Sequence, residues 1–273
     1  MDWFLYILVF ILGSLMGSFL NCVIYRLHQG KSFLRGRSFC PKCKKIIKWY
    51  DNIPLVGFLA LRGKCRFCLK KISWQYPIVE LTTAIIFLII FLVRFSSLDF
   101  NLLSFTHIDI LVILRDWIFS CFLLIIFIYD LKYYLILDKV SIPAMIIALA
   151  LNLIIQLASH GWHSIFSALF SYLLAALVCG GFFLLQFLIS RGKWIGGGDI
   201  RLGFLMGLML GWPYALVALF MAYILGALIG TGLLATGKKK MQSQIPFGTF
   251  LSLATLVALL FGSQLLNQYL SIL

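Results

Sequence analysis

Long apolar stretches recur along the whole chain and are separated by short polar segments. Residues 3–25 include no charged side chain, and the run "LTTAIIFLIIFLV" is apolar almost without interruption. A helix needs roughly 20 apolar residues to cross the ~30 Å hydrocarbon core of a bilayer. A transmembrane β-barrel would instead alternate apolar and polar residues along each strand. The pattern therefore predicts an all-α polytopic membrane protein.

Eight transmembrane spans are expected from this pattern. They cover approximately residues 3–25, 79–93, 110–129, 140–158, 165–189, 200–210, 214–236 and 248–272. The first span lacks the basic start and the shorter apolar region of a cleavable signal peptide, so we expect it to be retained. The third span carries Arg115 and Asp116 near one end, and the sixth is short because "GWP" follows it.

The basic residues fall almost entirely on one side of this arrangement. Segments 26–78, 131–139, 190–201 and 237–247 hold 13, 2, 3 and 3 of the 23 Lys and Arg residues. Loops rich in Lys and Arg face the cytoplasm, so this side is predicted to be cytoplasmic and both termini to lie outside. The net charge of +14 therefore indicates orientation and contact with anionic lipid headgroups. No recognisable nucleic-acid-binding motif accompanies it.

Composition agrees with a membrane protein and excludes an ordinary soluble domain. Hydrophobic residues make up 62% of the chain and charged residues only 12%, which is too little polar surface to cover a soluble core. We expect a first transmembrane span at 1–25, a cytoplasmic loop at 26–78 and a seven-helix membrane domain at 79–273.

Two G-x3-G pairs, Gly13/Gly17 and Gly226/Gly230, predict close helix packing.

The loop at 26–78 contains two C-x2-C pairs separated by 21 residues. These pairs are Cys40 with Cys43 and Cys65 with Cys68. Four thiolates at such spacing are typical of a structural Zn²⁺ site, whose ion supplies folding energy to a segment too small to fold alone. Two disulfides or four unliganded thiols are the alternatives, and a reducing cytoplasm disfavours the disulfides. Four protein ligands leave the ion no open position for catalysis.

Few acidic residues lie at the cytoplasmic membrane boundary: Glu80, Asp130, Asp138 and Asp199. Ionisable residues in or beside spans are candidates for function. Asp130 ends the third span and Asp199 begins the sixth, so both are expected at the same depth. Two neighbouring carboxylates can share a proton, one acting as base toward water and the other as acid toward a carbonyl. This pair therefore predicts peptide hydrolysis of the aspartic type.

Three glycines, Gly196, Gly197 and Gly198, directly precede Asp199. Without Cβ atoms they would let an extended substrate backbone approach the carboxylate. The simpler alternatives are that Asp199 is a helix N-cap and that Asp130 is a solvated interfacial residue. Helix-end polarity would make Asp199, at a helix start, the base and Asp130, at a helix end, the acid.

At this point the residues carry a family resemblance. "GGGD" matches the G-x-G-D motif of polytopic membrane aspartic proteases, and the whole chain resembles the type IV prepilin peptidases, which are bifunctional leader peptidase/N-methyltransferases. The resemblance runs from "GSFLNCVIYR" through the cysteine pairs and "ISWQYPIVELT" to "GGGDIRL" and "IPFGTFLSL". By position, the family's catalytic pair falls on Asp130 and Asp199, and its secondary acid on Asp138. Leu137 and Thr249 stand where proline is usual, and Arg201 where lysine is usual.

The resemblance implies a bacterial inner-membrane enzyme of type IV pilus assembly, competence or protein secretion. It would remove the short basic leader of prepilins or pseudopilins at the cytoplasmic face, after a glycine. It would then methylate the new N-terminal residue from S-adenosylmethionine. The residues themselves offer no Rossmann-type cofactor motif, so methylation is implied by resemblance alone, with the cysteine loop and Glu80 as its expected location.

Two other readings of the same residues stay open. A proton-coupled transporter would use Asp130 and Asp199 as proton carriers and the glycines as a helix break, but it leaves the cysteine loop unexplained. A zinc-dependent, non-enzymatic assembly scaffold would explain the loop but not the paired aspartates. The sequence does not reveal the oligomeric state.

Overall fold

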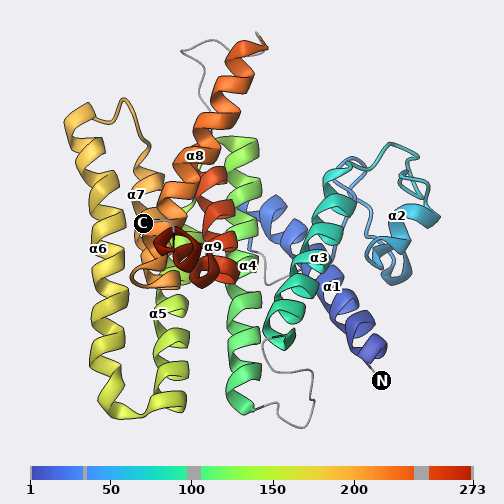
Figure 1. Ribbon diagram of the computed structural model, residues 1–273. Coiled ribbons are helices and arrows are strands. Elements are labelled where there is room, and N and C mark those ends of the chain that lie inside the picture. The colour runs from blue at the N-terminus through green and yellow to red at the C-terminus, as the bar shows by residue number, and fades with distance from the viewer. Residues whose placement is uncertain (1, 33–35, 97–105, 237–245, 272–273) are drawn as a thin grey trace. The chain divides into compact units, whose positions relative to one another are not determined.

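The computed structural model of the chain describes residues 2–32, 36–96, 106–236 and 246–271 (Figure 1). Helices dominate these residues and no strand occurs among them, apart from two isolated β-bridges in the cysteine loop. The predicted all-α class is therefore confirmed. Of the basic segment 237–247, residues 237–245 lie outside the described part of the chain.

Seven of the described helices are long and apolar enough to cross a membrane. They are α1 (Asp2–His28), α3 (Gln75–Ser96), α4 (His107–Tyr133), α5 (Asp138–His160), α6 (Ile165–Ser190), α8 (Tyr214–Ala235) and α9 (Phe247–Leu270). The sixth expected span forms α7 (Gly197–Leu210), which has only 14 residues. At 1.5 Å per residue α7 is about 21 Å long, shorter than the hydrocarbon core.

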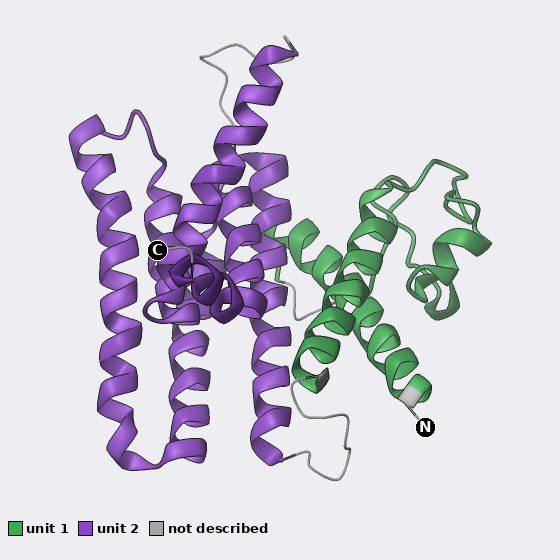
Figure 2. Ribbon diagram, in the orientation of Figure 1, with its two compact units in different colours: residues 1–101 green, residues 102–273 purple. Residues whose placement is uncertain are grey.

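The chain divides into two compact units, residues 1–101 and residues 102–273 (Figure 2). In the first unit α1 and α3 pack along one another. Their backbones approach closely, because a Cβ at Gly13 would lie 2.7 Å from Ala84 Cα and one at Gly17 would lie 2.6 Å from Glu80 Cα. The predicted packing role of this glycine pair is confirmed.

Between α1 and α3 the first unit holds the cysteine loop. Its short helical segments are the 3₁₀ turn η1 (Trp49–Asn52) and the helix α2 (Val56–Ala60). The two segments contact one another, and a Cβ at Gly57 would lie only 2.3 Å from the carbonyl oxygen of Asp51. Glycine at this position is therefore what lets α2 pack against η1.

The second unit is a helix bundle in which α4 and α7 each pack against both α5 and α9. The short helix α7 lies along α6, as Figure 1 shows. A Cβ at Gly207 would lie 2.3 Å from Ala176 Cα, and Gly203 receives the ring of Phe183. This G-x3-G pair was missed from the sequence, although its spacing is the same as that of the pairs noted there. Gly226 belongs to the second pair noted from the sequence. A Cβ there would make only ordinary contacts, with ring atoms of Phe250 and Phe247 on α9, so no close backbone approach occurs at this residue.

Candidate active site

Asp130 lies in the last turn of α4 and its side chain reaches the start of α9. The residue is only 5% exposed. Its Oδ2 accepts a hydrogen bond of 2.9 Å from the backbone N–H of Thr249, and the N–H of Gly248 also contacts the carboxylate. A Cβ at Gly248 would lie 2.8 Å from Oδ2. The carboxylate thus binds the unpaired N–H groups of the first turn of α9, which are natural donors to an anion.

Asp199 lies in the first turn of α7. The helix begins because Gly196 is extended (φ −76°, ψ 150°) while the residues that follow it are helical. The carboxylate turns back and accepts a hydrogen bond of 3.2 Å from the N–H of Gly196. Capping is therefore one role of Asp199, as the simpler alternative expected, but the side chain stays partly exposed. It is also within electrostatic reach of Asp130.

One side chain, Ile136, connects the two acidic positions. It belongs to the linker between α4 and α5 and contacts the glycines that flank the site. A Cβ at Gly198 would lie 2.8 Å from Ile136 Cβ, and one at Gly248 would lie 2.8 Å from Ile136 Cδ1. Ile136 therefore packs between the first turns of α7 and α9, which carry Asp199 and the partners of Asp130.

The three glycines before Asp199 differ in their surroundings. At Gly197 a Cβ would meet nothing within 4 Å, and at Gly196 its nearest contact would be Asp199 Oδ2 at 3.6 Å. Both residues are exposed. Gly198, in contrast, is closed off by Ile136. The first two glycines therefore have an open side, and the third serves internal packing.

Asp138, the secondary acid, begins α5 and forms an ion pair with Arg201 on α7. Arg201 follows Asp199 by two residues. Both side chains of the pair are about half exposed, at 50% and 44%, so the pair contributes little to stability. It does link the start of α5 to the start of α7, near the two aspartates.

An aromatic cluster beside Asp199 was not found by sequence reasoning. Tyr223 on α8 lies within electrostatic reach of Asp199, and its hydroxyl pairs with the amide of Gln186 on α6 at 3.1 Å. The Tyr223 ring lies 5.1 Å from that of Phe247 and 6.4 Å from that of Phe183. Aromatic residues within apolar spans give no sequence signal that separates a site from ordinary packing.

The four loop cysteines form one cluster. The Sγ atoms of Cys40, Cys43, Cys65 and Cys68 all lie within 4.8 Å of one another, and no cysteine forms a disulfide. The Cys40 and Cys68 sulfurs are 4.0 Å apart. Tetrahedral zinc with Zn–S bonds of ~2.3 Å places its sulfurs about 3.8 Å apart. The cluster therefore fits a metal ion, as the spacing predicted.

Each cysteine pair adopts the same local turn. Lys44 N–H donates to Cys40 carbonyl and Leu69 N–H donates to Cys65 carbonyl. Both Lys44 and Leu69 have positive φ, 59° and 56°. In such turns backbone N–H groups point at the sulfur. Hydrogen bonds from the N–H of Cys68, and to a smaller extent from that of Phe67, lower the pKa of the Cys65 thiol to about 7. A lowered pKa favours the thiolate that binds metal.

Two side-chain contacts hold the loop in place. Arg66, inside the second cysteine pair, binds Asp51 of η1 through two hydrogen bonds of 2.8 and 2.6 Å. The guanidinium lowers the pKa of the Asp51 carboxyl below its ordinary value. Glu80 on α3 is buried and accepts a hydrogen bond of 2.8 Å from the N–H of Leu55, at the start of α2. Its carboxylate therefore anchors the loop to α3.

Together these features define a class: helical membrane proteins with two aspartates near helix ends and a four-cysteine loop that could hold a metal ion. The sequence profile of the Type IV leader peptidase family matches residues 117–231, which include both aspartates. The profile of the bacterial Peptidase A24 N-terminal domain matches residues 11–94, which include the cysteine loop. The chain belongs to the Type IV leader peptidase family, and it is a multi-pass protein of the bacterial inner membrane.

Similar proteins cover nearly the whole chain. The prepilin leader peptidase/N-methyltransferase of Legionella pneumophila is 31% identical over 98% of this chain and 95% of its own length. The protein of the same name from Stutzerimonas stutzeri is 31% identical over 95% and 92%. That of Bacillus subtilis strain 168 is 28% identical over 96% of both chains. No solved structure matches the chain.

Proposed function

We propose that this protein is a membrane aspartic endopeptidase that removes the leader peptide of type IV prepilins or pseudopilins. The new N-terminal residue is then N-methylated by the same protein with S-adenosylmethionine as methyl donor. The names of the similar proteins support both activities. The structural observation that carries the peptidase is that the carboxylates of Asp130 and Asp199 each bind a backbone N–H at the start of a helix, α9 and α7. Ile136 packs against the first turns of these two helices.

In the proposed reaction one carboxylate removes a proton from a water molecule while the other, protonated, donates its proton to the carbonyl oxygen of the scissile peptide bond. The water oxygen bonds to the carbonyl carbon, and the tetrahedral intermediate collapses when the leaving nitrogen receives a proton. The N–H groups of Thr249 and Gly196 hold the two carboxylates in place. The exposed Gly196 and Gly197 leave room for the substrate backbone.

We propose that zinc occupies the four-cysteine cluster and acts structurally. The ion would join the two cysteine turns, and the Asp51–Arg66 pair would extend this order to η1. With all four positions taken by thiolates, the metal has no site for water or substrate. The metal therefore orders the loop and takes no part in peptide cleavage.

Methyl transfer is assigned to the first unit. The Glu80 carboxylate already accepts the Leu55 N–H, whereas the buried Oδ1 of Asn21 has no donor among the described residues. Asn21 Nδ2 donates to the Tyr76 carbonyl at 3.0 Å, so the amide lies between α1 and the start of α3. Asn21 Oδ1 is the acceptor that could receive a donor group of the cofactor, which would supply the electrophilic methyl.

The active site is proposed to face the cytoplasm, with both termini outside. The support is the distribution of basic residues, of which 21 of 23 fall in the four segments assigned to one side. Both aspartates border these segments. A leader peptide would reach them from the cytoplasm without crossing the bilayer.

The decisive experiment incubates purified protein in detergent or liposomes with a prepilin-type peptide and measures the products by mass spectrometry. Asp130→Asn and Asp199→Asn should each lower cleavage about a thousandfold or more, because asparagine keeps the shape but cannot transfer the proton. Both variants should remain in the membrane fraction and retain the metal. Near wild-type turnover in Asp199→Asn would refute the aspartic mechanism, and proton-coupled flux without cleavage would favour a transporter.

A further inference from the structure

A buried ionic cluster lies inside the second unit, away from the candidate active site. Arg115 and Asp116 were expected near the outer end of a span, and they lie about 12 Å along α4 from its first residue. The Asp116 side chain is fully buried and that of Arg115 is 15% exposed. Arg115 Nε and Nη2 bind Asp116 Oδ1 at 2.9 and 2.8 Å, and Nη1 donates to Asn152 Oδ1 on α5 at 3.2 Å.

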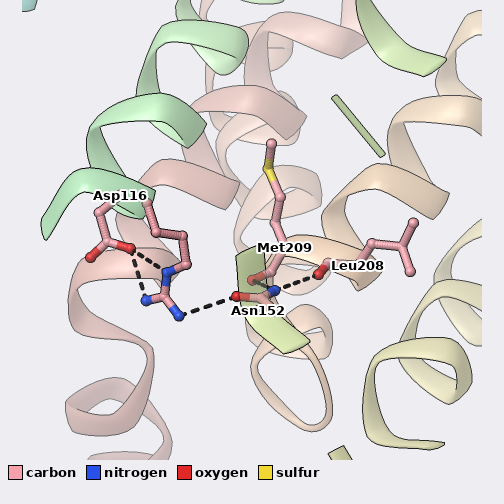
Figure 3. Close-up of polar contacts among 5 residues, drawn as sticks. Asp116, Asn152, Leu208 and Met209 are labelled. Carbon is pink, nitrogen blue, oxygen red and sulfur yellow. Dashed lines mark hydrogen bonds and ion pairs between the residues drawn. The ribbon is translucent and has the colours of Figure 1, made fainter. Parts of the chain in front are cut away.

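The same asparagine binds the end of α7. Its Nδ2 donates to the carbonyl oxygens of Leu208 and Met209 at 2.8 and 3.3 Å, as Figure 3 shows. The last carbonyls of a helix have no partner within the helix. Because α7 is too short to cross the bilayer, these carbonyls need partners from the protein. Asn152, only 1% exposed, supplies them.

The cluster and the aspartate pair are well separated along the same two helices. On α4, Asp116 precedes Asp130 by 14 residues, or about 21 Å. On α7, Leu208 follows Asp199 by nine residues, or about 14 Å. Since α4 and α7 both pack against α5, the chain of bonds from α4 through Asn152 to α7 fixes how far α7 can slide along its axis.

We propose that Arg115, Asp116 and Asn152 form a register clamp that sets the separation of Asp130 and Asp199. They are positioning residues, and this inference rests on the peptidase function proposed above. A buried ion pair often adds no net stability compared with apolar residues of similar size. Directional bonds to the end of a short helix do fix its axial position, and catalysis depends steeply on such placement.

The test compares Asn152→Leu with the wild-type protein on a prepilin-type peptide. Leucine keeps the number and branching of the side-chain heavy atoms and removes all three hydrogen bonds. We expect kcat to fall about ten- to hundredfold while KM stays within about threefold, since the substrate surface is untouched. With one carboxyl group acting as base and the other as acid, kcat of the wild-type protein should depend on pH as a bell-shaped curve. This curve should be narrower in Asn152→Leu, because two carboxyl groups that lie farther apart influence each other's titration less.

Two further variants make the outcome decisive. Gln156→Leu changes polarity one turn further along α5 and should leave kcat and the pH profile as in wild type. Asn152→Asp keeps the acceptor for Arg115 but loses both bonds to α7, so it should reproduce the kcat loss, and it carries the test if the leucine variant does not fold. Wild-type kcat and pH profile in a folded Asn152 variant would overturn the clamp. Absence of cleavage by the wild-type protein would instead overturn the proposed function.

Discussion

At the scale of single residues, Ile136 packs against the first turns of both α7 and α9, close to Asp199 and to the backbone partners of Asp130. Asp130 and Asp199 could be paired in advance because the hydropathy pattern and the distribution of basic residues place both at one depth. The sequence did not indicate a role for Ile136, because nothing in its local sequence distinguishes it from other apolar residues in linkers. Its contacts with Gly198 and Gly248 depend on the path of the linker in three dimensions.

The predicted role of Asp130 as the acid rested on the polarity of α4. The residue lies in the last turn of this helix, where the negative end of the helix dipole favours a protonated carboxyl. Its carboxylate, however, binds the N–H of Thr249 in the first turn of α9. Both carboxylates therefore lie at helix N-termini, and helix polarity does not distinguish the base from the acid. The bond requires a residue with a backbone N–H at position 249, which Thr249 provides and a proline would not.

The contrast between Gly198 and Gly197 gives a prediction at this scale. Gly198→Ala would place a methyl group 2.8 Å from Ile136 Cβ, which must move either the linker after Asp130 or the start of α7. We expect peptide cleavage to fall roughly ten- to hundredfold, because displacement of a catalytic group by about 1 Å has effects of that size. The measurement is the initial rate of cleavage by mass spectrometry.

Gly197→Ala is the matched control, since its methyl group would meet nothing within 4 Å of the protein. Both positions lie in the first turn of the same helix, so helix propensity changes equally in the two variants. Cleavage should fall less in Gly197→Ala than in Gly198→Ala, because the added methyl group enters only the space proposed for the substrate and displaces neither catalytic carboxylate. Equal losses in the two variants would show that the glycines serve the substrate and not the Ile136 contact.

At the scale of elements, hydropathy identified every long helix but did not reveal the nature of α7. A run of eleven apolar-rich residues ended by "GWP" could be a short span or a helix that ends within the bilayer. The structure shows a 14-residue helix that lies along α6 through Gly203 and Gly207. The partner of this glycine face could not be known from the sequence, because a G-x3-G pair does not say which helix it faces.

This packing predicts a stability difference between two glycines. Gly207→Ala would bring a methyl group within 2.3 Å of the Ala176 backbone on α6, and backbone atoms cannot rotate away. We expect the free energy of unfolding to fall by about 1–3 kcal/mol, measured by thermal or denaturant unfolding in detergent. Gly181→Ala on α6, where nothing lies within 4 Å, should leave it unchanged or slightly raised. A Gly207→Ala variant as stable as wild type would show that the two helices can separate freely.

At the scale of the whole molecule, the residues proposed for the two activities belong to different units. The cysteine cluster, Glu80 and Asn21 belong to residues 1–101, and both aspartates belong to residues 102–273. The matches of the two family profiles fall on either side of the same division. The sequence indicated the loop at 26–78 and a membrane domain from residue 79, which grouped the expected span at 79–93 with the later helices, whereas α3 lies within residues 1–101. The close backbone contact of that helix with α1 could not be read from apolar composition alone.

The last prediction tests this division by removing the metal ligands. Replacing Cys40, Cys43, Cys65 and Cys68 by serine should release about one equivalent of zinc, because serine does not bind it as a thiolate does. Without metal the two cysteine turns of the loop are no longer held together. The contacts of Asp130 with α9 and of Asp199 with Gly196 lie in the other unit. Methylation should therefore be lost nearly completely and cleavage only in part, with both products measured in one digest. Cys22→Ser, in the same unit but outside the cluster, should keep both activities. Parallel loss of methylation and cleavage would show that the loop also shapes the peptidase site.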